Sequence, residues 1–240
     1  TSISGLPGGL FSTTPTSAKD LANILREATS ESDGGGSTMA IGGGNKADYT
    51  QKTQITGVNN KVTGTAGNIA KLNSVSGFKN TVTNASNNII MGNDHTVTAN
   101  NTIAIGGLSS ADTRSAANTT SIGYDAKVSK EGGVALGYKS NATVDKGAAG
   151  YDPATGAAST ETNSTWKATS AAVSVGDVGN GITRQITSVA AGTADTDAVN
   201  VAQLKKAVAG ASDGNDTLVT NANGLSLSGN TLSMNVTDTA

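Results

Sequence analysis

Short apolar segments that each end in a glycine recur along residues 39–176. The clearest copies are Thr102–Gly106, Thr120–Gly123 and Val134–Gly137, and an earlier copy is Met39–Gly42. In each copy a large aliphatic residue directly precedes the glycine, and a small residue directly precedes the aliphatic one. A unit of about 14 residues with two short strands is too short for a strand-helix repeat, and it predicts one coil of a parallel β-solenoid. The glycine suits a corner, where the backbone needs positive φ.

Residues 51–100 carry a variant of this pattern, in which aliphatic residues pair seven positions apart. The pairs are Ile55 with Val62, Val75 with Val82 and Ile90 with Val97. We expect the large aliphatic residues to fill the interior of the solenoid. The predicted repeat core is Ile41, Ile55, Val62, Val75, Val82, Ile90, Val97, Ile103, Ile105, Ile122, Leu136 and Val175.

A small residue stands one position before each large aliphatic of the glycine-ended copies, so it points to the opposite face of the strand. If the aliphatic residues point inward, the small ones face outward and allow another chain to approach closely. The alternative is that they face solvent. The predicted trimer-interface residues of the solenoid are Ala40, Ala104, Ser121, Ala135 and Ser174.

Two segments have helical periodicity instead. Leu21, Ile24, Leu25 and Ala28 form one stripe, which predicts a helix over residues 17–30. The second predicted helix follows Thr183–Gly192, with Asp195 or Thr196 as its amino-terminal cap and Gly210 as its end.

Val201, Leu204 and Val208 lie on this second helix at the spacing of a short coiled-coil seam, so we add them to the predicted trimer interface. Residues 146–169 interrupt the period, and they predict an inserted loop or hairpin anchored by Tyr151 and Trp166. Alternation over residues 223–236 predicts a β-hairpin that opens a further module.

The composition excludes several classes of function. A net charge of −2 without a basic run gives no footprint for nucleic acid. No apolar stretch is long enough for a membrane-spanning helix. Aromatic residues are only 3% and glycines number 31, which suits narrow layers of small side chains. With no initiator Met and no signal peptide, we expect a mature fragment of a longer protein.

His95 is the one histidine of the chain, and there is no cysteine, so no metal site, cofactor site or catalytic dyad is predicted. Asn60 and Asn80 stand two positions before Val62 and Val82, as His95 does before Val97, so we interpret His95 as a substitute for asparagine at a turn. The carboxylates are scattered. An enzyme built on a β-solenoid, such as a hexapeptide-repeat acyltransferase or a polysaccharide lyase, remains the competing class, with His95 as its one candidate residue.

These motifs resemble the passenger region of the trimeric autotransporter adhesins, the surface fibres of Gram-negative bacteria. The aliphatic-Gly copies are similar to the YadA-like head repeats of this family, Gly150–Trp166 is similar to a head insert, and Thr183–Leu204 is similar to the neck. The implied regions are an N-terminal segment (1–36), head repeats (37–146), an insert with the last head coil (147–176), a neck (177–204), a short coiled coil (205–214) and a further β-rich stalk module (215–240).

The resemblance implies a mainly β fold: a left-handed parallel β-roll in an intertwined homotrimer, followed by the neck and the start of a trimeric coiled coil. It also implies a non-enzymatic adhesin that lies on the bacterial surface and is held in the outer membrane by a C-terminal anchor absent from this sequence. The expected partners are host cells, extracellular matrix or other bacteria. Tyr124, Tyr138 and Tyr151 are the candidate ligand surface. A trimeric phage tail fibre is a third alternative.

Overall fold

The computed structural model describes residues 38–212, 225–228 and 231–234. The helix predicted over residues 17–30 lies outside the described residues. The chain divides after Arg184 into two compact units, which are described separately.

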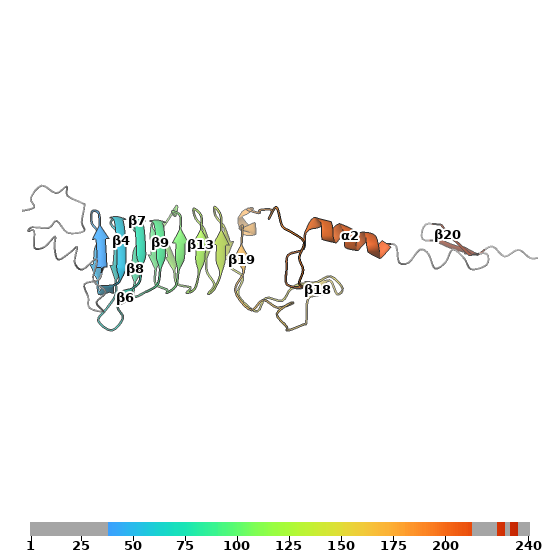
Figure 1. Cartoon of the computed structure of the whole chain (residues 1–240), viewed down its shortest axis with the longest axis horizontal. Helices are drawn as coiled ribbons and strands as arrows, with labels where there is room; N and C mark the ends of the chain where they lie inside the picture. Colours follow the sequence, from blue (N-terminus) through green and yellow to red (C-terminus); the bar gives the residue numbers. More distant parts are fainter. Residues whose placement is uncertain (1–37, 213–224, 229–230, 235–240) are drawn as a thin grey trace, which may run out of the picture. The chain divides into compact units, whose positions relative to one another are not determined.

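The first unit contains a parallel β-solenoid, which confirms the predicted fold class (Figure 1). One wall is an eight-stranded parallel sheet in which each strand pairs with the corresponding strand of the next coil. Its strands, in spatial order, are β1 (Thr38–Ile41), β4 (Thr53–Val58), β7 (Ser74–Phe78), β9 (Ile89–Asn93), β11 (Ile103–Ile105), β13 (Thr120–Ile122), β15 (Val134–Leu136) and β19 (Val173–Ser174). We call this sheet the first wall.

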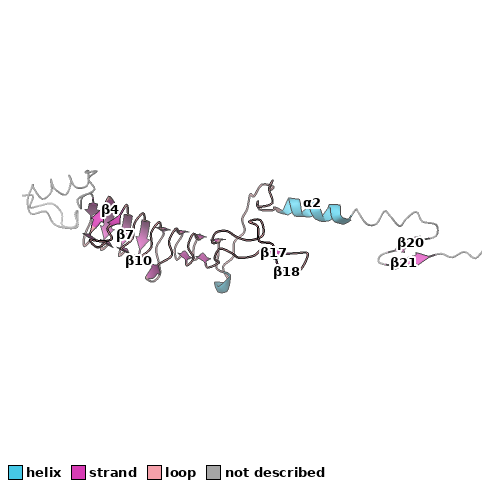
Figure 2. Ribbon diagram, turned by 90° about the horizontal axis from the view of Figure 1, so that it is seen from below, coloured by secondary structure: helices cyan, strands magenta, loops and turns pink. Residues whose placement is uncertain are grey.

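A second wall faces the first across the interior and is also parallel; Figure 2 gives a second view of the coils. Its five-stranded part comprises β2 (Lys46–Asp48), β5 (Lys61–Thr63), β8 (Thr81–Thr83), β10 (His95–Val97) and β12 (Asp112–Arg114). It continues with the pair β14 (Lys127–Val128) and β16 (Asn141–Ala142). A short side pair is formed by β3 (Thr50–Gln51) and β6 (Ala70–Lys71).

The glycines are in register along one edge of the first wall. Gly57 pairs with Gly77, and Gly77 pairs with Gly92. Each has positive φ, and a Cβ on Gly77 would lie 1.9 Å from the carbonyl oxygen of Gly92. Glycine is therefore required here for both its backbone conformation and the close approach of the next coil.

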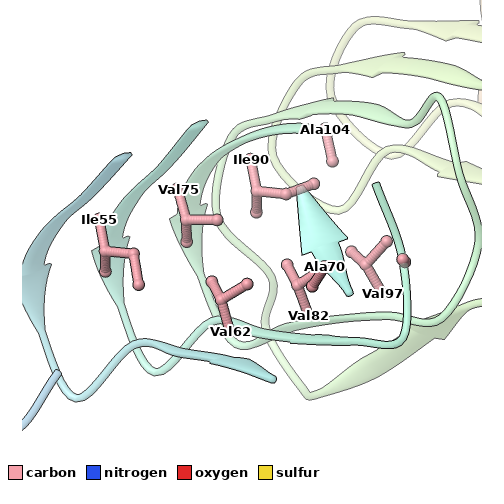
Figure 3. Packing of buried hydrophobic residues seen from close by; sticks show 9 residues of the cluster. Ile55, Val62, Ala70, Val75, Val82, Ile90, Val97 and Ala104 are labelled. Carbon is pink, nitrogen blue, oxygen red and sulfur yellow. The ribbon is translucent and has the colours of Figure 1, made fainter. Parts of the chain in front are cut away.

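The coils between residues 53 and 100 are filled by large aliphatic residues from both walls. Ile55, Val75 and Ile90 on the first wall point toward Val62, Val82 and Val97 on the second (Figure 3). All six are fully or almost fully buried. The structure therefore places these six predicted core residues in the interior.

The coils after residue 100 have the opposite arrangement. Ala104, Ser121 and Ala135 are buried in the same column as Ile90, whereas Ile122 and Leu136 on the outer face are 43% and 39% exposed. The prediction that the large residues point inward is wrong for these coils. The phase is set by the corner glycine: the residue two positions before it points inward, whatever its size.

Large and small residues are exchanged in the same way at the other predicted core and interface positions of the first wall. Ala40 and Ser174 lie in the inward column, since Ala40 pairs with Ile55 and Ser174 with Ala135. The predicted core residues that belong to the outer face of this wall are Ile41, Ile103, Ile105, Ile122, Leu136 and Val175.

Residues 145–170 form an insertion between two coils, because β15 pairs directly with β19 on the far side of it. Backbone bonds from Gly147 to Ala168 and from Gly150 to Trp166 form its stem. A hairpin of β17 (Tyr151–Asp152) and β18 (Ala157–Ala158) extends from the stem. The predicted insert is therefore present, but its side chains are mostly exposed, and the prediction that Tyr151 anchors it is wrong because Tyr151 is 69% exposed.

Near its end the first unit has a short 3-10 helix, η1 (Val178–Asn180). An antiparallel bridge between Asp177 and Ile182 encloses this helix. The second unit contains helix α2 (Val201–Ser212) and the antiparallel hairpin of β20 (Leu225–Ser228) and β21 (Thr231–Met234). The hairpin expected near the C-terminus is thus confirmed.

Helix α2 begins later and ends later than predicted. Asn200 Oδ1 accepts a bond from Gln203 N at 3.0 Å, and Gln203 Oε1 accepts one from Asn200 N at 3.2 Å, which is a capping box. The Asp197 carboxylate instead accepts bonds from the backbone of Thr193 and Ala194, so it holds a turn before the helix. Gly210 lies inside α2 and does not end it.

Candidate functional site

The outer face of the first wall carries the most extended apolar surface on the described solenoid. Two rows of side chains flank the inward column and point away from the interior. From β9 onward these rows are almost continuously aliphatic. We define the outer apolar face as Ile89, Met91, Ile103, Ile105, Ile122, Val134, Leu136 and Val173.

The same rows are polar in the preceding coils. Gln54 and Ser74 occupy one row, and Thr56 and Ser76 occupy the other. Thr56 Oγ1 donates to Ser76 Oγ at 3.0 Å, so the polar groups pair along the row. The outer apolar face is therefore a local feature of the later coils.

Side chains of this size rarely remain uncovered in a contiguous patch, and such patches commonly mark contact with another chain. The parallel register repeats the pattern along several coils, which presents a long flat surface. The outer apolar face is the part of the structure best suited to association. The predicted interface residues Ala104, Ser121 and Ala135 lie directly beneath it, in the interior.

Two of the three candidate ligand-surface tyrosines lie together. Tyr124 and Tyr138 follow the corner glycines of adjacent coils, and their rings stack with centroids 6.2 Å apart and planes 13° apart. Both are about half exposed, and Lys139 Nζ lies 5.4 Å from the Tyr138 ring centroid. Tyr151 is not part of this pair: it lies on β17 in the insert, where it is 69% exposed.

His95 occupies a position in a buried ladder of asparagines. The amides of Asn60 and Asn80 donate to the carbonyls of Gly77 and Gly92, the corner glycines of the next coil. His95 Nε2 makes the equivalent contact with Gly106 O at 2.6 Å. A bond to a carbonyl oxygen requires a donor, so Nε2 carries the proton. The interpretation of His95 as a substitute for asparagine agrees with this geometry.

The second imidazole nitrogen binds an arginine in the interior of the solenoid. Arg114 Nε donates to His95 Nδ1 at 3.2 Å, and its other nitrogens donate to Ser121 Oγ at 3.0 Å and to Ala126 O at 2.9 Å. Burial of the imidazole and the charge of Arg114 lower the pKa of His95 to about 4. His95 is 2% exposed and has both nitrogens engaged, so this arrangement positions it as a structural group.

Arg114 was not among the residues predicted from the sequence. This residue takes the inward position that Val97 has one coil earlier, and it separates the cluster ending at Ala104 from the cluster around Ala135. The sequence signal for it was a charged residue in the row of inward positions that Val62, Val82 and Val97 occupy in the preceding coils.

Arg184 closes the exposed end of the glycine edge. Its guanidinium donates to Ser140 Oγ at 3.2 Å, to Tyr138 O at 2.8 Å and to Val175 O. It also packs over Gly137, where a further coil would otherwise stack. Arg184 therefore donates hydrogen bonds to backbone carbonyls that have no further coil beside them to donate.

In the second unit, the predicted interface residues of the helix are all solvent-facing in the single chain. Val201, Leu204 and Val208 are each more than half exposed. Gln203 ties the start of α2 to the preceding loop, because its side-chain amide bonds both the N–H and the C=O of Gly192. The helix start is held by its own loop, while its apolar positions are left uncovered.

Comparisons with known proteins give consistent matches. A family described as the coiled stalk of trimeric autotransporter adhesin matches residues 185–226. The autotransporter adhesin BadA of Bartonella henselae is 60% identical over 72 residues, which is 30% of this chain. The trimeric autotransporter adhesin AtaA of Acinetobacter sp. (strain Tol 5) is 54% identical over 68 residues, which is 28% of this chain. The match spans about 2% of the length of each of these relatives.

The first unit is a parallel β-solenoid with an exposed apolar outer face, and the second unit contains a capped helix with exposed Val201, Leu204 and Val208. Over the matched segments the chain is similar to trimeric autotransporter adhesins, which agrees with the resemblance of its sequence motifs. Among the described residues, none of the helices has the length and apolar character needed to cross a lipid bilayer.

Proposed function

We propose that this chain is the head-and-neck region of a homotrimeric, non-enzymatic adhesin that attaches a bacterium to host cells, to extracellular matrix or to other bacteria. The observation that carries the proposal is the outer apolar face, which is long, regular and uncovered in the single chain. In the trimer the three outer apolar faces meet one another. Each fully buried aliphatic side chain contributes about 1.5–3 kcal/mol.

The helix extends the same association. Val201, Leu204 and Val208 form the first turns of a three-stranded coiled coil, with the capping box at Asn200 and Gln203 fixing where it begins. We place the trimer on the bacterial surface, held in the outer membrane by an anchor.

Adhesion by such a trimer depends on valency. Three copies of a weak site on a rigid scaffold gain avidity without needing a deep pocket. The candidate binding surface is the side of the solenoid away from the outer apolar face, together with the insert. Tyr124, Tyr138 and Tyr151 are the exposed aromatic residues that we assign to it.

The test is attachment of beads coated with the 240-residue chain to cultured epithelial cells, to fibronectin, to collagen and to a bacterial lawn. The matched comparison is the Ile122→Asp, Leu136→Asp variant, which we expect to abolish trimerisation while leaving Tyr124, Tyr138 and Tyr151 unchanged. We expect attachment by the trimer and a loss on the order of a hundredfold for the monomeric variant. Equal attachment by trimer and monomer, or none by the trimer on any surface, would contradict the proposal.

A further inference from the structure

A polar groove lies on the second wall of the last coils, away from the outer apolar face. It has a volume of about 490 Å³. Lys127 on β14 and Asn141 on β16 form its floor, since their neighbours Val128 and Ala142 point into the interior. Asp125 and Lys139 border it at the corner, and the turn containing Asp177 closes one end.

The acceptors of this groove are fixed in place. Asp125 Oδ1 accepts bonds from Ser109 N at 2.7 Å and from Ser109 Oγ at 2.9 Å. Burial opposes ionisation, but these bonds and the charges of Lys139 and Lys127 outweigh it and keep the pKa of Asp125 below its ordinary value. Asp177 Oδ2 accepts from Asn180 Nδ2 at 2.7 Å, which orients the carboxylate at the closed end.

Lys127, Lys139 and Asn141 supply the donors of the groove, with Lys139 Nζ 5.4 Å from the Tyr138 ring centroid and Asn141 Nδ2 donating to Asp177 Oδ2 at 3.4 Å. Neither Lys127 nor Lys139 is in salt-bridge contact with a carboxylate among the described residues, and each contributes an ammonium group at the groove. With two carboxylates and two ammonium groups the groove has no net charge. It therefore favours a neutral ligand that both donates and accepts hydrogen bonds over a strong anion or cation.

An aromatic surface adjoins the groove. Tyr124 directly precedes Asp125 and Tyr138 directly precedes Lys139, and the two stacked rings are about half exposed. Sugars combine hydroxyl groups with an apolar ring face, so polar side chains beside exposed aromatic rings match both parts of a saccharide. A peptide would use the same hydrogen-bonding groups, but the stacked rings beside fixed carboxylates fit a saccharide better.

We propose that the groove between Asp125, Lys127, Asn141 and Asp177 binds a short, uncharged oligosaccharide, with Tyr124 and Tyr138 contacting a sugar ring. This inference rests on the proposed adhesive function and names the chemical class of one ligand. Each chain has one such groove, so a trimer presents three copies of the site to a glycan-bearing surface.

The experiment uses the fluorescently labelled 240-residue chain on an array of neutral oligosaccharides of hexoses and N-acetylhexosamines, with uronic-acid-containing glycans printed beside them. The test variant is Lys127→Ala, Asn141→Ala. The matched control is Lys61→Ala, Thr81→Ala, which removes the paired residues at the same coil position of β5 and β8, outside the groove. Circular dichroism verifies that both variants fold.

We expect binding to at least one neutral oligosaccharide, a loss of about tenfold or more in apparent affinity for the test variant, and no change for the control. Equal losses in both variants, or binding to uronic-acid glycans alone, would overturn the proposal. So would attachment to cells and matrix by a chain that binds no glycan on the array, a result that leaves the adhesive function intact. Competition by an unglycosylated peptide that depends on Lys127 and Asn141 would instead assign the groove to a peptide.

Discussion

The coils before residue 100 and the coils after it share one backbone but distribute their side chains in opposite ways. Both have parallel strands in continuous register and the same column of corner glycines. In the earlier coils Ile55 and Val75 are buried, with polar residues outside. In the later coils Ala104 and Ala135 are buried, with aliphatic residues outside. The coil containing Ile90 is the transition, because it is aliphatic on both faces.

This difference indicates two sources of stability. The earlier coils bury large side chains within one chain, so they have a core of their own. The later coils bury mainly small residues, and most of their large aliphatic area lies where a neighbouring chain would cover it. The boundary is the polar cluster of His95, Arg114 and Ser121, which interrupts the apolar interior between the two regions.

The largest expected effect comes from placing charges on the outer apolar face. We expect Ile122→Asp with Leu136→Asp to convert the proposed trimer to a monomer, since an uncompensated buried carboxylate costs several kcal/mol per chain. Sedimentation velocity measures the outcome. Lys61→Asp with Thr81→Asp on the second wall is the control and should remain trimeric. A trimer that survived the first pair would show that this face is not the interface.

Corner glycines should be equally indispensable in both regions. A Cβ on Gly77 would lie 1.9 Å from Gly92 O, and one on Gly123 would lie 2.5 Å from Gly137 C, both at positive φ. We expect Gly77→Ala and Gly123→Ala each to lower the free energy of unfolding by about 4 kcal/mol or more. Gly67→Ala, whose Cβ would meet nothing within 4 Å, should be close to neutral in urea denaturation. If Gly123→Ala were also neutral, the shared corner geometry would be wrong.

Removing a large side chain should have different consequences in the two regions. Ile90→Ala leaves a cavity in the interior, and we expect a loss of about 2–5 kcal/mol that does not depend on protein concentration. Ile105→Ala acts on the outer apolar face, so its smaller effect should depend on concentration. Urea denaturation at two protein concentrations a hundredfold apart distinguishes them. Concentration dependence for both variants, or for neither, would remove the distinction.

The boundary cluster predicts a pH dependence. The pKa of His95 is about 4 in the folded chain, against its ordinary 6.5. Between these values the unfolded chain takes up a proton that the folded chain does not, so stability falls as the pH falls from 6.5 to 4 and then levels off. The loss is about 3 kcal/mol.

His95→Asn is the control for this pH dependence. It keeps a donor for Gly106 O but cannot titrate, so the slope between pH 6.5 and 4 should disappear in thermal unfolding. At neutral pH the variant should lose about 1 kcal/mol, because Arg114 Nε no longer has its acceptor. Asp125 acts in a different pH range: its lowered pKa stabilises the folded chain above about pH 3.8, and this contribution is lost only as the pH falls below that value. An unchanged slope in His95→Asn would assign the pH dependence to other groups.

The smallest expected effect is removal of the insert. Because β15 pairs with β19 without it, replacing residues 146–170 by a short Gly-Ser turn should keep the solenoid intact. We expect the unfolding midpoint to change by no more than about 2–4 °C, which corresponds to about 1 kcal/mol. Circular dichroism during heating measures it. Loss of the β spectrum would show that the insert is part of the core.

The fold class followed from sequence because the glycine period and the pairs such as Ile55 with Val62 depend on local spacing. The side-chain orientation of the later coils did not follow, since strict alternation allows either face to point inward. The distance to the corner glycine was the usable signal: Ile55 precedes Gly57 by two positions, whereas Ile105 directly precedes Gly106. Arg114 and the groove at Asp177 were missed because they depend on contacts between coils distant in sequence.

The most direct test of the central claim is the mass of the 240-residue chain in solution, measured by light scattering after size-exclusion chromatography. We expect a trimer of about three times the 23.6 kDa of one chain, as closed threefold symmetry requires. A folded monomer of 23.6 kDa would contradict it, because the outer apolar face would then be stable without a partner.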